Sequence, residues 1–253
     1  MRSVLIKLDA VDLRFPLRGG GELRVINRLT LEVPAGSFTA VVGPSGCGKS
    51  SLLRIIAGLL PPTHGRRIAG EGVDDALALG MNFQRPVLLP WLTVRENALL
   101  PYAAAEREVP PEALERLDAL IAVAGLQGFD DALPAELSGG MQMRASLIRT
   151  FVAGPRLVLM DEPFGALDEP TRLRLGIELR RMANANGCAI VFVTHNTQEA
   201  VFLADRLVAL SARPARVVDA FDVPFGPDRH EGLYDDAALT TLSRRLRLLA
   251  DYA

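Results

Sequence analysis

The segment Gly43-Pro44-Ser45-Gly46-Cys47-Gly48-Lys49-Ser50 constrains the fold of this chain most strongly, because it satisfies the pattern G-x-x-x-x-G-K-[ST]. Residues 38–42 before it form a short apolar run typical of a buried strand, and residues 50–60 after it have helical spacing up to Pro61. A strand, a glycine-rich loop and a helix in this order turn backbone N–H groups towards the phosphates of a nucleotide. An ordinary glycine-rich turn would not need the strand and the helix.

The side chains of this segment suit the same chemistry. Lys49 can reach the β- and γ-phosphates, and the Ser50 hydroxyl can bind Mg²⁺. The N-terminus of the helix adds partial positive charge beside the phosphates. We expect the helix to bury one apolar face, which consists of Leu52, Ile55, Ile56 and Leu59.

Composition narrows the class of protein. The 253 residues suffice for one large domain with an insertion, and a net charge of −2 gives no sign of a nucleic-acid partner. No apolar run is long enough to span a bilayer, and residues 1–9 are charged too early for a signal peptide, so we expect a cytoplasmic location. Cys47 and Cys188 lack metal-ligand spacing and are predicted to be reduced thiols.

The pattern along the chain predicts one α/β domain with two additions. Residues 1–85 and 155–223 are expected to form the core, with an antiparallel β-piece near the N-terminus. Residues 86–154 start with several prolines and are predicted to be an inserted helical subdomain. One of its helices is expected from Glu112, with an apolar face of Leu114, Leu117, Leu120 and Ile121.

The last stretch, residues 224–253, is predicted to be a linker followed by a basic amphipathic helix. That helix could touch lipid headgroups or pack on this protein's own surface. Its apolar spacing comes from Leu239, Leu242, Leu246 and Leu249.

Polar side chains follow two of the predicted core strands. Asp161 and Glu162 come after the apolar run 157–160, and His195 follows the run 188–194. The carboxyl ends of parallel strands meet at the ligand-binding edge of a sheet. Asp161 can therefore hold Mg²⁺, Glu162 can polarise the water that attacks the γ-phosphate, and His195 can sense that phosphate. The alternatives are a strand that stops at its first charges and a surface histidine.

Several other positions have patterns that suggest a ligand contact or a helix cap. Gln84 ends a strand-like run and can face a ligand, and Phe15 could stack on a base or lie in the core. Ser138-Gly139-Gly140 precedes a helical run, so it is either a second anion-binding N-terminus or a simple N-cap. Asn196 and Glu199 resemble a capping box at the start of the helix that follows His195.

Five motifs in fixed order resemble those of the nucleotide-binding ATPase subunits of ATP-binding cassette (ABC) transporters. They are Gly43 to Ser50 (Walker A), Gln84 (Q-loop), Leu137 to Met141 (signature), Leu157 to Glu162 (Walker B) and His195 (switch histidine). The resemblance implies an α/β P-loop NTPase (RecA-like) core with an N-terminal antiparallel β-subdomain and an inserted α-helical subdomain. It also implies that Ala166-Leu167-Asp168 is the D-loop.

The resemblance assigns roles to individual residues. Glu162 would be the base, His195 would contact the γ-phosphate, and Gln84 would link the metal site to the helical subdomain. Mg²⁺ would be held by Ser50, Gln84 and Asp161. The residues expected to contact ATP are Phe15, Gly43, Pro44, Ser45, Gly46, Cys47, Gly48, Lys49, Ser50, Ser51, Ser138, Gly139 and Gly140.

The resemblance further implies a head-to-tail homodimer, in which Ser138 to Gly140 of one copy closes over the Walker A loop of the other. The partners would be a membrane permease and, indirectly, an extracytoplasmic solute-binding protein. Residues 83–97 and 211–214 are similar to those of importers for nitrate, sulfonate, taurine and thiamine precursors, in which the stretch after Gln84 meets the permease. The apolar run 88–91 could equally belong to the core.

Three positions depart from the usual pattern of the family: Met143, Asn196 and Ala215. None of them removes a phosphate or metal ligand. The leading interpretation is an ATPase that powers solute uptake at the cytoplasmic face of the membrane. A soluble ABC ATPase acting on ribosomes or DNA is the alternative, which the near-neutral charge and the single motif set disfavour. A nucleotide-binding module without catalysis is opposed by the presence of Glu162 and His195.

Overall fold

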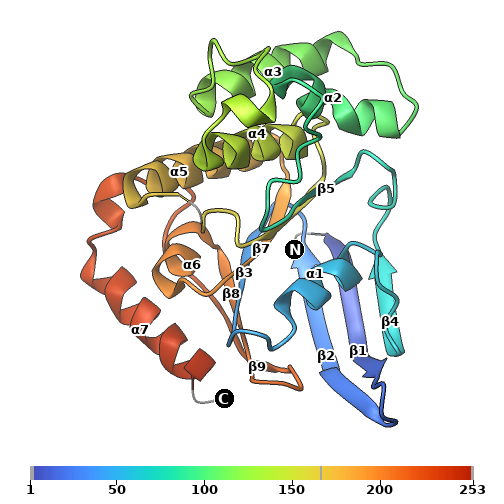
Figure 1. Cartoon of the computed structure of the whole chain (residues 1–253). Helices are drawn as coiled ribbons and strands as arrows, with labels where there is room; N and C mark the ends of the chain where they lie inside the picture. Colours follow the sequence, from blue (N-terminus) through green and yellow to red (C-terminus); the bar gives the residue numbers. More distant parts are fainter. Residues whose placement is uncertain (1–2, 166, 252–253) are drawn as a thin grey trace.

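The computed structural model describes residues 3–165 and 167–251, and it is an α/β fold with two sheets (Figure 1). The smaller sheet has the strand order β2-β1-β4 and is antiparallel. The larger sheet has the order β5-β6-β7-β3-β8-β9, in which only β9 runs antiparallel to its neighbour. The predicted fold class, with its N-terminal antiparallel β-piece, is therefore confirmed.

The strands are β1 (Val4–Pro16), β2 (Glu22–Pro34), β3 (Phe38–Val42), β4 (His64–Ala69), β5 (Leu79–Asn82), β6 (Leu157–Asp161), β7 (Ala189–Thr194), β8 (Arg206–Leu210) and β9 (Val217–Asp222). The α-helices are α1 (Lys49–Ile56), α2 (Val94–Ala104), α3 (Pro111–Val123), α4 (Gly139–Phe151), α5 (Glu169–Ala185), α6 (Thr197–Leu203) and α7 (Ala237–Asp251). Two short 3₁₀ turns span Pro134–Glu136 and Glu231–Leu233.

The central strands are buried on both faces, which explains why they read as continuous apolar runs. In β3 the side chains of Phe38, Ala40 and Val42 lie in the core shared with the helices α2 to α6. Val41 points to the other face, into the core that α1 shares with β1 and β2. Because successive side chains of a strand point to opposite faces of the sheet, β3 contributes to the core on each face.

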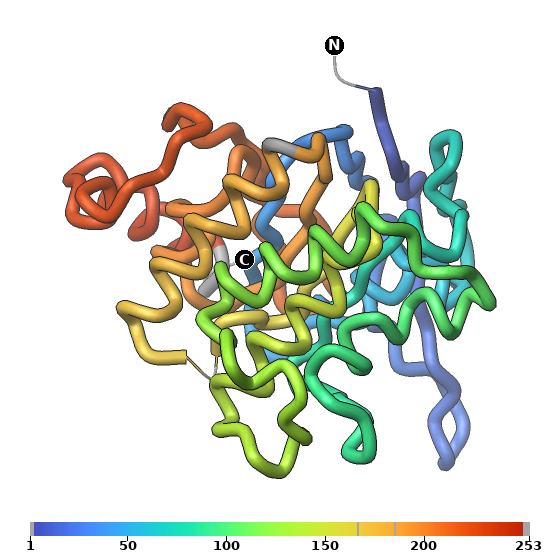
Figure 2. The backbone as a smooth tube through the Cα atoms, turned by 90° about the horizontal axis from the view of Figure 1, so that it is seen from above, coloured from blue at the N-terminus to red at the C-terminus, as the bar shows by residue number. Residues whose placement is uncertain are grey.

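The helices α2, α3 and α4 gather beyond one edge of the larger sheet, as predicted for the helical insertion (Figure 1). The C-terminal segment lies on the opposite side of the molecule from β1 and β2, as Figures 1 and 2 both show. Its helix α7 packs on α6 and buries Leu239 and Leu246 completely. The interpretation in which the tail packs on this protein's own surface is the one that the structure adopts.

Two predicted apolar faces differ from those observed. The helix α1 ends at Ile56 rather than near Leu60, because Gly58 adopts a φ of 76° and Leu59 N–H donates to Arg54 O at 2.9 Å. Leu59 is consequently 65% exposed. In α3 the buried stripe includes Ala113, and Leu114 is exposed.

Candidate functional site

The loop between β3 and α1 leaves the centre of the larger sheet and is shaped by glycines. Gly46 and Gly48 have φ values of 72° and 124°, in the region that favours glycine. A Cβ on Gly48 would lie 2.8 Å from Val25 Cγ1, so β2 packs against the loop too closely for a larger residue. Gly48 is also the N-cap of α1 and has no side chain to satisfy the first helical N–H groups, which leaves them for an anion.

Lys49 is the cation at the centre of this loop. Its side chain is buried, and its ammonium donates to the carbonyl oxygens of Gly43 at 2.7 Å and Pro44 at 2.9 Å. Carbonyl oxygens satisfy the N–H donors without neutralising the charge. A buried ammonium of this kind suits a phosphate ligand.

A cleft of about 410 Å³ opens beside the loop. It is lined by Phe15, Leu23, Val25, Ser45, Gly46, Gly48, Lys49, Ser50, Ser51, Gln84, Asp161, Glu162 and Arg213. The structure thus brings residues from β1, β2, the phosphate loop and the ends of β5 and β6 to one place. Phe15 is 39% exposed and faces this cleft rather than the core.

Glu162 lies at the end of β6, and two polar side chains from neighbouring strand ends contact it. Gln84 Nε2 donates to Glu162 Oε2 at 3.2 Å, and His195 Nδ1 lies 3.2 Å from Glu162 Oε1. The backbone of Glu162 has a φ of 48°, which is costly for a residue with a Cβ, and its N–H donates to Val193 O at 3.0 Å. The sheet therefore fixes the direction in which this carboxylate points.

The oxygen ligands that Mg²⁺ prefers are present in the same cleft. Ser50, Gln84 and Asp161 all line it and offer a hydroxyl, an amide and a carboxylate. Among the residues that the structure describes, no three His, Cys, Asp or Glu side chains cluster as a metal site. Mg²⁺ commonly completes such a sparse ligand set with water and with the phosphates of a nucleotide, so these residues fit a metal that arrives with its nucleotide.

Several predicted residues lie outside this cleft. Gly43, Pro44 and His195 line an adjacent pocket of about 250 Å³ together with Arg247 of α7. Cys47 is buried, and burial raises the pKa of its thiol, so it is a poor nucleophile.

Ser138, Gly139 and Gly140 lie at the start of α4 and do not line the cleft of their own chain. Ser138 caps α4, since its side chain accepts from Met141 N–H at 3.3 Å, and both Ser138 and Gly139 are exposed. The N-cap interpretation is correct for the isolated chain, and the exposed helix start is open to a ligand or partner. Of the predicted D-loop, Ala166 lies outside the described residues.

Sequence reasoning missed three of the residues that line the cleft. Arg213 follows β8, the strand beside β3, and its Nε donates to Gly46 O at 3.0 Å, so it supports the phosphate loop from the neighbouring strand. Its position after a strand of the parallel sheet was a usable signal. Leu23 and Val25 are ordinary apolar residues of β2, and only the packing of the two sheets places them in the cleft.

The sequence model that describes the ABC transporter family matches residues 26–165. This chain belongs to the ABC transporter family. As an ABC ATPase it binds ATP and hydrolyses it, and the cleft beside Lys49 is the part of the fold built for phosphates.

Related proteins agree with this assignment. An uncharacterised ABC transporter ATP-binding protein of Methanocaldococcus jannaschii, MJ0412, is 43% identical over 85% of this chain and 80% of that protein. The nitrate import ATP-binding protein NrtC of Synechocystis is 39% identical over 89% of this chain, which spans only 34% of that longer protein. The taurine import ATP-binding protein TauB of Roseobacter denitrificans is 37% identical over 87% of this chain and 82% of that protein.

Solved ABC cassettes share the fold. The dimeric structure of the bacterial ABC transporter cassette MJ0796 superposes with a TM-score of 0.77 at 28% identity, covering 88% of this chain and all of that one. A post-hydrolysis state of the same cassette, bound to ADP and Pi, gives a TM-score of 0.76. Within the described residues of the present chain, no helix has the length and apolar character needed to cross a membrane.

Proposed function

We propose that this chain is the ATP-hydrolysing subunit of an ABC importer and couples ATP-driven dimer closure to uptake of a small solute through a separate permease. The observation that carries the catalytic part is the Glu162 carboxylate, which Gln84 and His195 contact at the edge of the phosphate cleft. The import part rests on relatives named as nitrate, taurine and bicarbonate transport subunits. These names favour an importer over a soluble ATPase that acts on ribosomes or DNA.

In the proposed reaction, Glu162 takes the proton of the attacking water, and His195 contacts the γ-phosphate. The strained backbone and two polar contacts hold the carboxylate in one direction, which is the positioning that a general base needs. Lys49 and the N–H groups of the loop stabilise the phosphate charge. Ser50, Gln84 and Asp161 would hold Mg²⁺, which supplies charge stabilisation to the phosphates when bound.

The proposed dimer follows from the position of the signature residues. Ser138 and Gly139 are exposed at the N-terminus of α4 and lie outside the cleft of their own chain. A second copy placed head to tail would bring this helix start to the γ-phosphate, as the resemblance implies. The ABC cassette MJ0796, which shares the fold, has been solved as a dimer. Each copy would then hold half of each ATP site.

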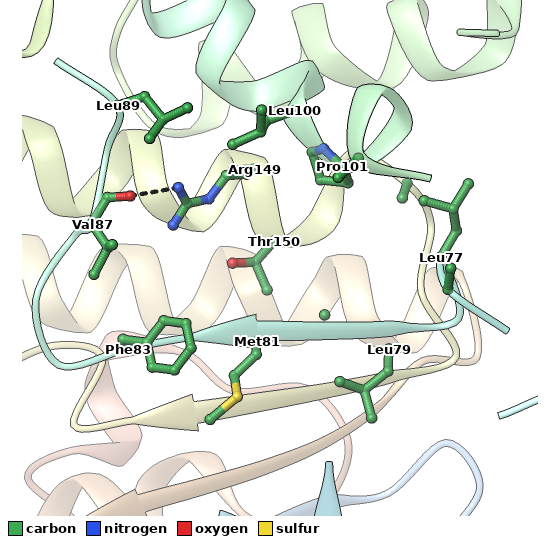
Figure 3. A pocket seen from close by; sticks show the side chains of 14 residues that line it. Leu77, Leu79, Met81, Phe83, Val87, Leu89, Leu100, Pro101, Arg149 and Thr150 are labelled. Atoms are coloured by element: carbon green, nitrogen blue, oxygen red, sulfur yellow. Dashed lines mark hydrogen bonds between the residues drawn. The ribbon is translucent and has the colours of Figure 1, made fainter. Parts of the chain in front are cut away.

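The proposed permease contact is an apolar groove beside Gln84. Its volume is about 360 Å³, and it lies between β5, the segment after Gln84 and the helices α2 and α4 (Figure 3). Arg149 of α4 holds the wall of the groove by donating to Val87 O at 2.8 Å and Pro86 O at 3.1 Å. Leu88 packs on the core, whereas Trp91 is 70% exposed. A cytoplasmic helix of the permease with an apolar face is the occupant that we propose.

The proposal also covers the location of the subunit, its solute and its domain organisation. The subunit would sit at the cytoplasmic face of the membrane, held there by the permease, with a solute-binding protein on the other side. The solute would be a small compound of the nitrate, sulfonate or taurine kind, or one like a thiamine precursor. Residues 1–85 with 155–223, 86–154 and 224–253 are the proposed core, helical subdomain and tail.

Phosphate release with Mg²⁺ and ATP tests the catalytic assignment in Glu162→Gln, with Glu115→Gln on the exposed face of α3 as the matched control. We expect hydrolysis to be lost in Glu162→Gln while ATP binding is kept, and the control to match the wild type. Hydrolysis at the wild-type rate in Glu162→Gln would remove Glu162 from the mechanism.

A further inference from the structure

Glu199 does not make the contact that its sequence pattern predicts. In a capping box its carboxylate would accept from the backbone N–H of Asn196. That N–H donates instead to Thr194 Oγ1 at 3.0 Å, while Asn196 Oδ1 caps the N–H groups of Gln198 and Glu199 at 3.1 Å each. The box is only half formed, and the Glu199 side chain, 7% exposed, turns into the protein.

The buried carboxylate meets Arg172 of α5. Arg172 Nε lies 4.0 Å from Glu199 Oε2, and Arg172 Nη2 donates to the carbonyl oxygen of Leu167 at 3.0 Å. Leu167 belongs to the turn that follows Glu162, and Glu199 belongs to the helix that follows His195. Arg172 therefore lies between the turn that follows Glu162 and the helix that follows His195.

This pair lines the same cavity as Glu162 and His195. A cavity of about 70 Å³ separates the two pairs, and its volume is large enough for ordered water. All but one of the residues that line it have polar or charged side chains: Glu162, Gly165, Arg172, Thr194, His195, Asn196 and Glu199.

Burying the Glu199 carboxylate and the Arg172 guanidinium in this way costs folding free energy. Glu199 Oε1 and Arg172 Nε are both buried, and neither has a hydrogen-bond partner among the residues described. Burial raises the pKa of Glu199 to about 7, against the opposing influence of Thr194, Arg172 and His195. The other charged or titratable groups around this pair are Glu162, Glu169, Tyr234 and Asp235. Apolar residues of similar volume are often as stable or more stable in place of a buried ion pair, so stability is a weak reason for these charges.

We propose that Arg172 and Glu199 are positioning residues for ATP hydrolysis, which hold the turn after Glu162 and the turn after His195 in one fixed relation. This inference rests on the proposed roles of Glu162 and His195. Neither Arg172 nor Glu199 lines the nucleotide cleft, so they act on the rate through the groups that do.

The test is a double-mutant cycle on steady-state ATP hydrolysis with Arg172→Gln, Glu199→Gln and the double variant. We expect kcat to fall about 10- to 100-fold in each single variant, since small misplacements of reacting groups have effects of that order. The KM for ATP should stay at its wild-type value. The double variant should be no slower than the slower single variant, because both changes break one connection.

The matched control is the exposed pair Arg181 and Glu178 on the same helix α5. Arg181→Gln and Glu178→Gln should leave kcat and KM unchanged. Nucleotide binding and thermal melting of every variant separate loss of fold from loss of rate, and Glu199→Asp, which keeps the charge, should recover part of kcat.

Three results would overturn the inference. Single variants with wild-type kcat exclude a positioning role, and so do losses that multiply in the double variant or that appear equally in KM. These outcomes leave the proposed catalytic base intact if Glu162→Gln is inactive. Retained hydrolysis in Glu162→Gln would instead reject the proposed reaction itself.

Discussion

The segment after Gln84 is held in part by one buried side-chain amide, so the loss of stability on its removal can be calculated. Asn97 of α2 is fully buried. Its Nδ2 donates to the carbonyl oxygens of Leu89 at 3.1 Å, Leu92 at 2.8 Å and Thr93 at 3.0 Å, and its Oδ1 accepts from Leu89 N–H at 2.8 Å. The Asn97 side chain therefore fixes residues 89–93, next to the part of the same segment that Arg149 holds.

The substitution Asn97→Ala would remove all of these side-chain bonds. Leu89 N–H and Leu92 O would lose their partner, whereas Leu89 O would still accept from Leu92 N–H at 3.2 Å and Thr93 O from the backbone N–H of residue 97 at 2.9 Å. The amide has two N–H donors, so at most two of the three carbonyl bonds are strong, and the Leu89 N–H bond is the third. At about 1 kcal/mol for each lost bond, the free energy of unfolding should fall by about 3 kcal/mol. Urea denaturation of purified wild type and variant measures this difference.

The matched control is Asn186→Ala. Asn186 is exposed at the end of α5 and makes one side-chain bond, from Nδ2 to Met182 O at 2.8 Å, so its loss should cost less than about 1 kcal/mol. Amide hydrogen exchange at Leu89 should also speed up in Asn97→Ala alone. Equal stability losses in the two variants, with unchanged exchange at Leu89, would refute this account of the segment.

Three further predictions concern the nucleotide cleft and its surroundings. Phe15→Ala should weaken ATP binding by about 1–3 kcal/mol, while Phe15→Tyr keeps the affinity; an unchanged Kd in the alanine variant would exclude stacking. Gly48→Ala should lower stability by about 1–3 kcal/mol, because its φ of 124° and the 2.8 Å approach of Val25 Cγ1 leave no room for a Cβ; thermal melting at the wild-type temperature would contradict this. The pKa of Glu199 rises from 4.5 to about 7 on folding, so the folded state binds more protons than the unfolded state in this window and stability falls as pH rises through it. Glu199→Gln should therefore be more stable than the wild type at pH 8 by up to about 3 kcal/mol and gain much less at pH 5, whereas an equal gain at both pH values would show that its charge is not the cause.

Local patterns predicted most of the architecture and of the cleft. The phosphate loop is a motif whose strand and helix are its sequence neighbours, so β3, the loop and α1 could be placed together. Asp161 and Glu162 could be placed at the ligand edge because apolar strands of a parallel sheet end there.

Where the sequence-based predictions were wrong or incomplete, the cause lies in the three-dimensional packing or in a local turn of the chain. The capping pattern predicted that the Glu199 carboxylate would turn back to the Asn196 N–H. In the structure that N–H donates to Thr194 Oγ1, and the carboxylate lies near Arg172 of another helix. Arg213 donates to Gly46 O across 167 residues of sequence; its place after a strand was visible in the sequence, but the pairing of that strand with β3 was not. Leu59 fitted the helical spacing, but the left-handed turn at Gly58 ended the helix before it.

If each ATP site is built from two copies of this chain, two variants that are inactive alone should complement each other when mixed. Lys49→Ala disables the phosphate loop, and Ser138→Arg places a bulky cation at the exposed start of α4. Each variant alone should fail to hydrolyse ATP, although Ser138→Arg should still bind it.

Mixed in equal amounts, the two variants can form a dimer in which an intact phosphate loop faces an intact Ser138. If the site is shared, phosphate release should return in the mixture and should rise with the protein concentration. A mixture that stays as inactive as its components, or a Ser138→Arg variant that hydrolyses ATP alone at the wild-type rate, would contradict the shared site.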